Sequence, residues 1–338
     1  MVEFEGAEYG LVADIGGTNA RFALAPIKQF DAATGLPLIE QELVAVAALN
    51  GAEYDTIAEA INAYLAGPAA GYDRPDHSVM AIACPTDQDQ ITMTNHTWSF
   101  SVSELKATLG FETLVFINDY NALANAIPQL DEAGLVKVGR GEAVHGLPMV
   151  VTGPGTGLGL AGLAFGDARP VTLQTEGGHA HFAPTDDVEI DILRFLLNKY
   201  DRVSIERLVS GMGLENIYQA LCNLRGVAAE SIRAPDISSR AVAKTDPVCE
   251  EALARFCAIL GSYAGDVALT LGAKGGVYIT GGIIPRVLSY FQNSQFRSRF
   301  EAKGRLSSFN QPIPTYVVVA KQPGLLGSAA VLNHRLNR

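Results

Sequence analysis

Residues 11–24 are Leu11-Val12-Ala13-Asp14-Ile15-Gly16-Gly17-Thr18-Asn19-Ala20-Arg21-Phe22-Ala23-Leu24, in which two apolar runs flank two glycines and a threonine. This pattern predicts a strand, a tight turn and a second strand. Adjacent glycines allow backbone N–H groups to line a concave turn that binds anionic oxygens, and Thr18 adds a hydroxyl. Asp14, at the end of the first strand, suits a hydrated Mg2+ ion. An ordinary β-hairpin with a two-glycine turn is the plainer interpretation.

A second stretch has the same plan. Residues 149–161 are Met149-Val150-Val151-Thr152-Gly153-Pro154-Gly155-Thr156-Gly157-Leu158-Gly159-Leu160-Ala161, again an apolar run, a glycine-threonine turn and an apolar continuation. Gly17-Thr18 aligns with Gly155-Thr156. Two such hairpins predict a duplicated plan, with two related lobes that hold a nucleotide triphosphate between them. The chain contains no Gly-Lys-Ser or Gly-Lys-Thr, which excludes a Walker P-loop.

One motif suggests a dinucleotide-binding protein instead. Residues 157–162 match the dinucleotide-binding pattern GxGxxG, and Glu176 lies near the distance expected of a ribose-binding acid. A dinucleotide site requires a helix after the glycines. Here residues 166–170 predict a turn and Val171-Thr172-Leu173 predict another strand, so a dehydrogenase is disfavoured.

The composition is that of a folded, acidic protein. The 338 residues are 48% hydrophobic and 18% charged, which is typical of a globular enzyme large enough for two lobes. The formal net charge of −11 argues against nucleic acid or an anionic membrane as a partner, because phosphate contacts require a basic face. Near the N-terminus, acidic residues stand where a signal peptide has a basic region and an apolar core, so we expect no export.

The cysteines and the longest uncharged stretch lead to two further expectations. No CxxC pair occurs among the four cysteines, which are Cys84, Cys222, Cys249 and Cys257. We therefore expect no structural zinc site, and reduced core cysteines in a cytoplasmic protein. Residues 146–166 carry no charge, but Pro148, Pro154 and closely spaced glycines argue against a membrane-spanning helix there.

Hydrophobic periodicity predicts an α/β protein. The expected strands cover residues 10–15, 20–25, 42–47, 78–83, 113–118, 276–280 and 315–320, and the expected helices cover residues 55–66, a short segment from the capping box Ser101-Val102-Ser103-Glu104 to Gly110, a segment ending before Pro128, residues 187–199, 212–225 and 247–272, and a segment from Pro323. We expect a small lobe of residues 1–129 plus 319–338 and a large lobe of residues 130–318, from pattern alone.

Asn118-Asp119 stands where a buried strand is followed by a helix. Ligands bind at such strand ends in open α/β sheets. A carboxylate there can act as the general base for a substrate hydroxyl that attacks a γ-phosphoryl group. The plainer interpretation makes Asp119 the N-cap of the following helix.

Two further groups suit a sugar and a nucleotide. Glu176 and His179 are separated by two glycines, which permit a sharp reversal and expose both side chains to vicinal hydroxyls. Glu206 is either another hydroxyl acceptor or an exposed helix acid, and a metal site of His179 with His181 is a weaker alternative. Gly281-Gly282 ends a strand with accessible backbone, where adenine and ribose could rest, although an ordinary strand-to-helix turn fits as well.

Together these motifs closely resemble the bacterial ATP-dependent glucokinases of the hexokinase-like superfamily. The resemblance rests on residues 14–21, Thr94-Asn95-His96-Thr97-Trp98, Ile117-Asn118-Asp119, Gly155-Thr156-Gly157-Leu158-Gly159, Glu176-Gly177-Gly178-His179, Glu206, Gly281-Gly282 and Pro323-Gly324-Leu325-Leu326-Gly327, in this order. It implies the actin-like ATPase fold, with two ribonuclease-H-like lobes and an active-site cleft that holds the sugar. A cysteine-rich zinc motif near Glu176 is missing, which favours the zinc-free group.

The resemblance also assigns roles. It implies that Asp119 is the base for the 6-hydroxyl of glucose, that glucose binds to Asn118, Asp119, Glu176, His179 and Glu206, and that ATP binds to Ala13, Asp14, Ile15, Gly16, Gly17, Thr18, Asn19, Arg21, Gly155, Thr156, Gly157, Gly281 and Gly282. Asp14 would hold Mg2+ through water. The products would be glucose 6-phosphate and ADP, and the family implies a homodimer.

Three other functions fit parts of the pattern. A kinase for another hexose would keep the same motifs. A sugar-responsive regulator that binds DNA would need a helix-turn-helix, for which no room precedes the first strand. A filament-forming actin relative would keep the glycine turns, but would have no use for Glu176, His179 and Glu206.

Overall fold

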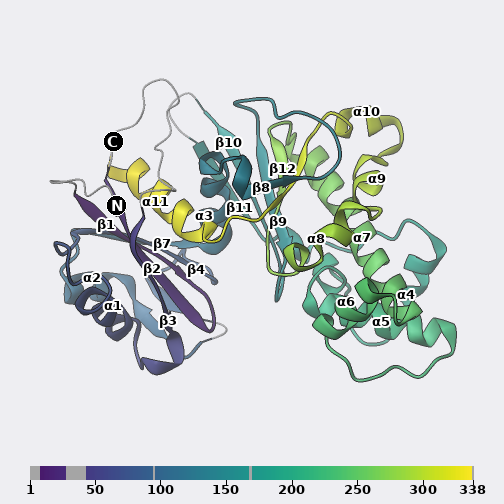
Figure 1. Ribbon diagram of the computed structural model, residues 1–338, viewed down its shortest axis with the longest axis horizontal. Helices are drawn as coiled ribbons and strands as arrows, with labels where there is room; N and C mark the ends of the chain where they lie inside the picture. The colour runs from purple at the N-terminus through teal and green to yellow at the C-terminus, as the bar shows by residue number, and fades with distance from the viewer. Residues whose placement is uncertain (1–7, 28–42, 94–95, 167–169, 337–338) are drawn as a thin grey trace. The chain divides into compact units, whose positions relative to one another are not determined.

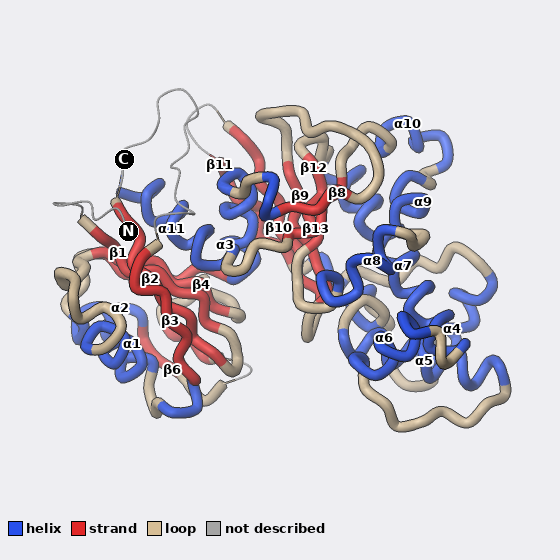
Figure 2. Tube along the Cα trace, in the orientation of Figure 1, coloured by secondary structure: helices blue, strands red, loops and turns tan. Residues whose placement is uncertain are grey.

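The computed structural model describes residues 8–27, 43–93, 96–166 and 170–336. Thr94 and Asn95 of the quoted motif, and residues 167–169 of the expected turn, lie outside this part. The chain forms two compact units: unit 1 contains Met1–Glu132, Gly166–Thr172 and Ala320–Arg338, and unit 2 contains Ala133–Phe165 and Leu173–Val319. Each unit is built on one main sheet (Figures 1 and 2).

Unit 1 has a five-stranded sheet. Its strand order is β3 (Val44–Asn50), β2 (Asn19–Pro26), β1 (Tyr9–Ile15), β4 (His77–Ile82) and β7 (Thr113–Asn118). β1 and β2 form an antiparallel hairpin, whereas β1, β4 and β7 run parallel. The parallel strands therefore end at the same edge of the sheet.

Helices cover both faces of this sheet (Figure 1). Successive β1 side chains point to opposite faces, so Leu11 packs with helices α1 (Ile57–Ala66) and α2 (Val102–Leu109), and Val12 packs with α3 (Asp119–Ala126) and α11 (Pro323–Leu336). A two-stranded sheet of β5 (Gln90–Thr92) and β6 (Ser99–Ser101) completes the described part of unit 1.

Unit 2 repeats the plan of unit 1. The strand order of its sheet is β11 (Pro170–Thr175), β10 (Leu158–Phe165), β9 (Met149–Pro154), β12 (Gly276–Ile279), β13 (Thr315–Val318) and β8 (Leu135–Lys137). The first three residues of β11 are counted with unit 1. β9 and β10 form an antiparallel hairpin, and β9, β12 and β13 run parallel. The duplicated plan that the two glycine turns predict is therefore confirmed.

Unit 2 is also rich in helices. These are α4 (Asp187–Leu197), α5 (Gly211–Arg225), α6 (Ala234–Ala243), α7 (Pro247–Leu271), α8 (Leu288–Gln292), α9 (Phe296–Glu301) and α10 (Ser307–Asn310). Helix α7 packs against α5, α6 and α9. Among the described helices, α7 alone is long and apolar enough to cross a membrane, and 78% of its most apolar window is buried inside the molecule. Helix α7 is thus the central core helix of unit 2.

Most predicted elements occur within a few residues of their expected positions. Ser101 accepts the Glu104 N–H, and Gly110 ends α2 with a φ of 72°. Residues 146–166 form the strands β9 and β10, and all four cysteines are free and buried, as expected. The sequence prediction missed α6, whose buried residues Ala234, Ile237 and Ala241 have helical spacing but are separated by polar residues. It also missed the short helices α8, α9 and α10, and the strands β5, β6 and β8, which have three residues each.

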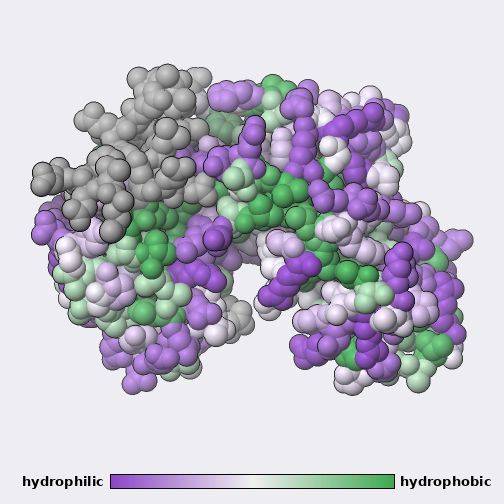
Figure 3. Space-filling view, viewed as in Figure 1, coloured by the Kyte–Doolittle hydropathy of each residue, from purple (hydrophilic) through white to green (hydrophobic). Residues whose placement is uncertain are grey.

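The visible surface of the helical part of unit 2 is mainly hydrophilic, with small hydrophobic patches (Figure 3). Large exposed apolar side chains on or beside α4, α5 and α6 are Leu197, Met212, Leu224, Val227 and Val242. Singly exposed apolar residues are normal on folded proteins. They identify no interface, so the homodimer stays a prediction.

Helices α3 and α11 cross closely at Gly327, which gives a test of the packing. A Cβ on Gly327 would lie 1.7 Å from the backbone oxygen of Ala122. Alanine in a helix interior gains up to about 1 kcal/mol over glycine from propensity, but overpacking costs roughly 1–3 kcal/mol or more. We expect Gly327→Ala to lower the free energy of unfolding, measured by urea denaturation.

Gly71→Ala is the matched control for this substitution. A Cβ on Gly71 would meet nothing within 4 Å. This variant should unfold at the wild-type urea concentration or slightly above it. A Gly327→Ala protein as stable as Gly71→Ala would show that α3 and α11 do not need glycine at their crossing.

Candidate active site

In unit 1, the candidate residues lie at the sheet edge where β1, β4 and β7 end. Asp14 is in register with Ala81 of β4, and Ala81 is in register with Ile117 of β7. Ile117 therefore lies two strands away from Asp14, at about 10 Å, since neighbouring strands lie about 4.8 Å from each other, and Asp119 follows Ile117 by two residues. Open α/β sheets bind ligands at this edge.

The β1–β2 turn presents two backbone donors. Gly16 N–H donates to Asn19 O at 3.0 Å, and Gly51 N–H donates to Thr18 O at 2.9 Å. Within the described part of the chain, the N–H groups of Gly17 and Thr18 have no hydrogen-bond partner. Thr18 is exposed. The turn can therefore offer two adjacent N–H groups and a hydroxyl to an anion.

The two glycines keep side chains away from the turn, as the sequence predicts. Neither Gly16 nor Gly17 has a positive φ, so left-handed backbone is not the reason for glycine here. A Cβ on Gly16 would meet only Asn19 O, at 3.6 Å. What glycine provides here is a turn without side chains above its N–H groups. By geometry alone the turn is a β-hairpin, so its phosphate role stays a prediction.

The Asp14 side chain lies between the Arg21 guanidinium and the first turn of α11. Its carboxylate lies 3.6 Å from the Arg21 guanidinium. Burial raises the pKa of Asp14, and Arg21 opposes this shift. A Cβ on Gly324, in the first turn of α11, would lie 2.6 Å from Asp14 Cγ, so only glycine leaves the carboxylate in place.

These residues fit Mg2+ only in part. No group of three or more His, Cys, Asp or Glu side chains able to hold a metal occurs in the described ranges. Mg2+ is commonly held by one or two carboxylates, with waters and substrate phosphates as the other ligands. Asp14 fits that mode of binding, so a bound nucleotide would supply the remaining oxygens.

Asp119 has the environment of a general base. Asn118 Oδ1 accepts the Tyr120 N–H at 2.9 Å and is the N-cap of α3. The interpretation of Asp119 as merely the N-cap is therefore wrong. Burial raises the pKa of Asp119 to about 6, with a further increase from the Asp14 charge, although the Tyr120 N–H bond opposes the shift. Such a carboxyl can exchange a proton near neutral pH.

In unit 2, the candidate residues lie at the corresponding edge of its own sheet. In the β9–β10 turn, Gly155 N–H donates to Gly157 O at 2.8 Å. The N–H groups of Thr156 and Gly157 have no partner among the described residues, and Thr156 is exposed. This turn therefore presents the same combination of two N–H groups and a hydroxyl as the turn in unit 1.

The Gly281-Gly282 segment packs directly on this hairpin. A Cβ on Gly281 would lie 2.3 Å from Pro154 O, and Gly281 has a φ of 86°. A Cβ on Gly282 would meet nothing within 4 Å. Gly281 is required by the close approach, whereas Gly282 leaves open backbone beside the turn.

The predicted sugar-binding residues of unit 2 gather around Leu158. Glu206 lies in the 3-10 helix η6 (Ile205–Arg207), and its Oε2 accepts the Leu158 N–H at 2.9 Å. The 3-10 helix η5 (Gly177–His179) approaches from the other side, since a Cβ on Gly178 would lie 2.0 Å from Leu158 O. Ile205 N–H donates to Ala180 O at 2.8 Å and joins the two helices.

The structure bears out one sequence interpretation here and decides another. Glu176 and His179 are exposed, as expected, at the two ends of a tight turn in which the His179 N–H donates to Glu176 O at 3.0 Å. Gly177 and Gly178 also allow this turn to pack closely on β10. Glu206 is half-buried and bonded to β10, so it is not an exposed helix acid.

Arg202 was not singled out by the sequence. It donates to His179 O at 2.5 Å and to His181 Nε2 at 3.2 Å. These bonds leave the two histidines in a polar network, and no metal cluster in the described ranges includes them. No motif in the sequence marks Arg202 as a neighbour of His179 and His181.

The comparisons with known proteins cover nearly the whole chain. The family model of Glucokinase matches residues 11–335. The glucokinase of Neisseria meningitidis serogroup C (strain FAM18) is 45% identical over 96% of this chain and 95% of its own length. The crystal structure of a glucokinase from an Antarctic psychrotroph has a TM-score of 0.87 and 38% identity, and covers 97% of this chain and 99% of that chain.

A more distant structure is a ROK family glucokinase from Streptomyces griseus in complex with glucose and AMPPNP. It has a TM-score of 0.61 and 17% identity, over 96% of this chain and 99% of that chain. The shared architecture is the actin-like ATPase fold, which defines the class as sugar kinases of this fold. Within that class, the chain belongs to the glucokinase family.

Proposed function

We propose that this protein transfers the γ-phosphoryl group of Mg-ATP to the 6-hydroxyl of D-glucose, giving glucose 6-phosphate and ADP. The observation that carries the proposal is Asp119, a carboxyl with a pKa of about 6 at the end of β7. The base of a kinase must take the proton of a hydroxyl as its oxygen attacks phosphorus. Membership of the glucokinase family supports this choice of substrate.

In this proposal, residues within each unit have assigned roles. Unit 1 contributes Asp119 as the base and Asn118 beside it. The Oδ1 of Asn118 is already used as a cap, so its Nδ2 donor would contact the sugar. Unit 2 contributes the hydroxyl acceptors Glu176 and Glu206, together with His179. Carboxylates accept sugar hydroxyls in charge-assisted hydrogen bonds, which select among stereoisomers.

The two glycine hairpins would hold the phosphates of ATP. Each presents two N–H groups and a threonine hydroxyl, at Gly17-Thr18 and at Thr156-Gly157. Gly281-Gly282 would accommodate adenosine. Bound Mg2+ would neutralise phosphate charge as it develops, with Asp14 as its protein ligand. Donors fixed in advance stabilise the transferring phosphoryl group without reorganisation.

The test is phosphoryl transfer across a panel of hexoses, with ADP release followed and the sugar phosphate identified. We expect glucose to be preferred over mannose, fructose and glucosamine, and turnover to need both ATP and Mg2+. A different preferred hexose would keep the mechanism and replace the substrate. Sugar binding without turnover would favour the regulator, and ATP-dependent light scattering would favour a filament.

A further inference from the structure

The β9–β10 turn is held at two points by the segment that carries Glu206. The Leu158 N–H donates to Glu206 Oε2, and the Gly211 N–H donates to Gly155 O, both at 2.9 Å. Gly155 begins the turn and Leu158 follows it, so the two bonds bracket Thr156 and Gly157. The N–H groups of Thr156 and Gly157 are the two donors of this turn that have no hydrogen-bond partner among the described residues.

The segment that makes these bonds is itself fixed. Ser210 is the N-cap of α5, where its Oγ accepts the Gly213 N–H at 3.0 Å. The same hydroxyl donates to Glu206 O at 2.8 Å. Helix α5 therefore anchors both Glu206 and Gly211, and through them the turn.

The turn is shaped to receive the carboxylate. A Cβ on Gly157 would lie 2.5 Å from Glu206 Oε2, whereas a Cβ on Gly155 would meet nothing within 4 Å. The two glycines of this turn are therefore needed for different reasons. Gly157 makes room for Glu206, and Gly155 does not.

If Glu206 bound only the sugar, its position beside the β9–β10 turn would weaken phosphate binding and bring no benefit. A carboxylate beside a phosphate-binding turn repels phosphate and takes one N–H donor, that of Leu158, away from it. In return, the remaining donors are fixed in direction before the nucleotide arrives. The bond uses Oε2, and no described residue donates a hydrogen bond to Oε1.

We propose that Glu206 is a positioning residue for the nucleotide phosphates as well as a sugar ligand. One carboxylate oxygen orders the β9–β10 turn and the other meets a sugar hydroxyl, so sugar and nucleotide binding are coupled through one side chain. Only the sugar half of this inference rests on the proposed function. The nucleotide half stands on the bond to Leu158.

The test compares Glu206→Gln with Glu206→Ala. Calorimetry measures the Kd of ADP without sugar and the Kd of glucose without nucleotide, and thermal unfolding verifies that each variant is folded. The glutamine keeps a carbonyl oxygen for the Leu158 N–H and removes the charge that repels phosphate, so its ADP affinity should equal or exceed that of wild type. The alanine leaves this N–H unpaired and should weaken ADP binding by about tenfold or more. Both variants should weaken glucose binding.

A second pair of variants tests the bond between the Leu158 N–H and Glu206 by changing the turn instead of the carboxylate. Gly157→Ala displaces the carboxylate and should weaken glucose binding, although Gly157 is predicted to contact only the nucleotide. Gly71→Ala, outside the residues proposed to bind sugar or nucleotide, is the control, and its glucose Kd should equal that of wild type because a Cβ on Gly71 meets nothing within 4 Å.

The two hypotheses fail differently. Wild-type ADP affinity in Glu206→Ala would overturn the positioning role while leaving the sugar role intact. Equal loss of ADP affinity in the glutamine and alanine variants would also overturn it, because the charge and not the hydrogen bond would then matter. Wild-type glucose affinity in Glu206→Gln would remove Glu206 from the proposed sugar site.

Discussion

Asp119→Asn is expected to lower kcat by about 100- to 10,000-fold, which is the usual contribution of general-base catalysis. The lower limit corresponds to about 2.7 kcal/mol in the barrier. Asparagine keeps the shape of the side chain but cannot take the proton of the 6-hydroxyl. Steady-state kinetics with saturating glucose and ATP measure the effect. Near-normal turnover by the folded variant would remove Asp119 from its role as base.

The pH profile gives an independent check of the same residue. A base must be ionised to act, and the pKa of Asp119 is about 6 in the unliganded protein. The value of kcat/KM, which reports ionisations of the free enzyme, should therefore fall as the pH drops below about 6. Exposed Asp73 provides the control, because Asp73→Asn should keep this profile. An unchanged profile in Asp119→Asn would assign the ionisation to another group.

The folded state of Asp119→Asn is not expected to be weaker. A raised carboxyl pKa means that the ionised side chain is less favourable in the folded chain than in the unfolded one. This cost is fully present above the folded pKa, decreases as the pH falls below that value and is absent below the pKa of the unfolded chain. At pH 8 the neutral asparagine avoids the cost, so its melting temperature should equal or exceed that of wild type. A loss of activity therefore reports on the reaction and not on folding.

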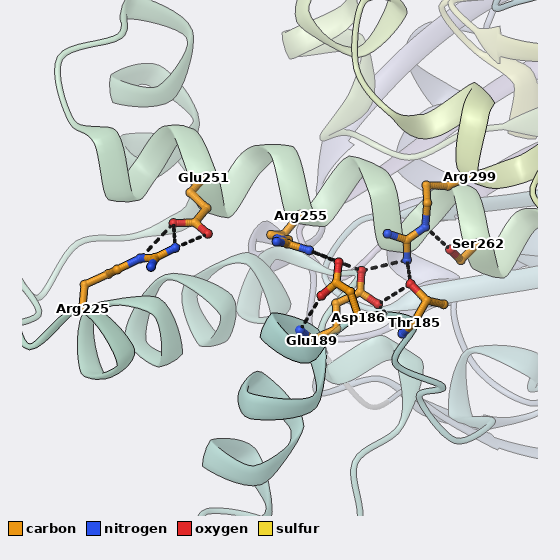
Figure 4. A network of polar contacts seen from close by, with 8 residues as sticks. All are labelled: Thr185, Asp186, Glu189, Arg225, Glu251, Arg255, Ser262 and Arg299. Carbon is orange, nitrogen blue, oxygen red and sulfur yellow. Dashed lines mark hydrogen bonds and ion pairs between the residues drawn. The ribbon is translucent and has the colours of Figure 1, made fainter.

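The largest expected effect on stability concerns Glu189 in unit 2 (Figure 4). Its side chain is fully buried at 0% exposure. Oε1 pairs with the Arg299 guanidinium at 2.7 Å, and Oε2 accepts the N–H and hydroxyl of Thr185 at 2.8 and 2.9 Å. Arg255 pairs with Asp186, the N-cap of α4, which accepts the Glu189 N–H. The network joins α4, α7 and α9.

Glu189→Ala is expected to lower the free energy of unfolding by about 3–5 kcal/mol. Removing one member of a buried ion pair leaves its partner as an uncompensated charge, which costs more than the pair itself contributes. Here the unpaired group would be Arg299, whose side chain is 16% exposed. Far-ultraviolet circular dichroism during urea unfolding follows the helices of this unit.

Glu251→Ala is the matched control from the same view (Figure 4). Glu251 pairs with Arg225 at 2.7 Å, but the Arg225 side chain is 52% exposed. Exposed pairs contribute about 0–1 kcal/mol because water screens both charges. Equal losses for Glu189→Ala and Glu251→Ala would contradict the assignment of Glu189 as a buried charge centre.

Local features of the structure could be predicted because their causes lie within a few residues. The two hairpins follow from apolar runs broken by glycine and threonine, and α2 begins and ends at Ser101 and Gly110 because these residues cap it. The junction of β7 and α3 places Asp119 at a strand end by the same logic. Helix α6 and the three-residue strands were missed because their apolar patterns are short or interrupted.

The sequence by itself determined the class of fold, the two glycine turns and the types of side chain available for phosphates, hydroxyls and a proton. Only the tertiary structure decided what those side chains do to one another. Glu206 reaches the N–H of Leu158 across 48 residues of chain, and Gly324 of α11 leaves room for Asp14 of β1. Burial, with a smaller contribution from Asp14, raises the pKa of Asp119. Such effects depend on distances between segments that are remote in the chain, and packing sets those distances.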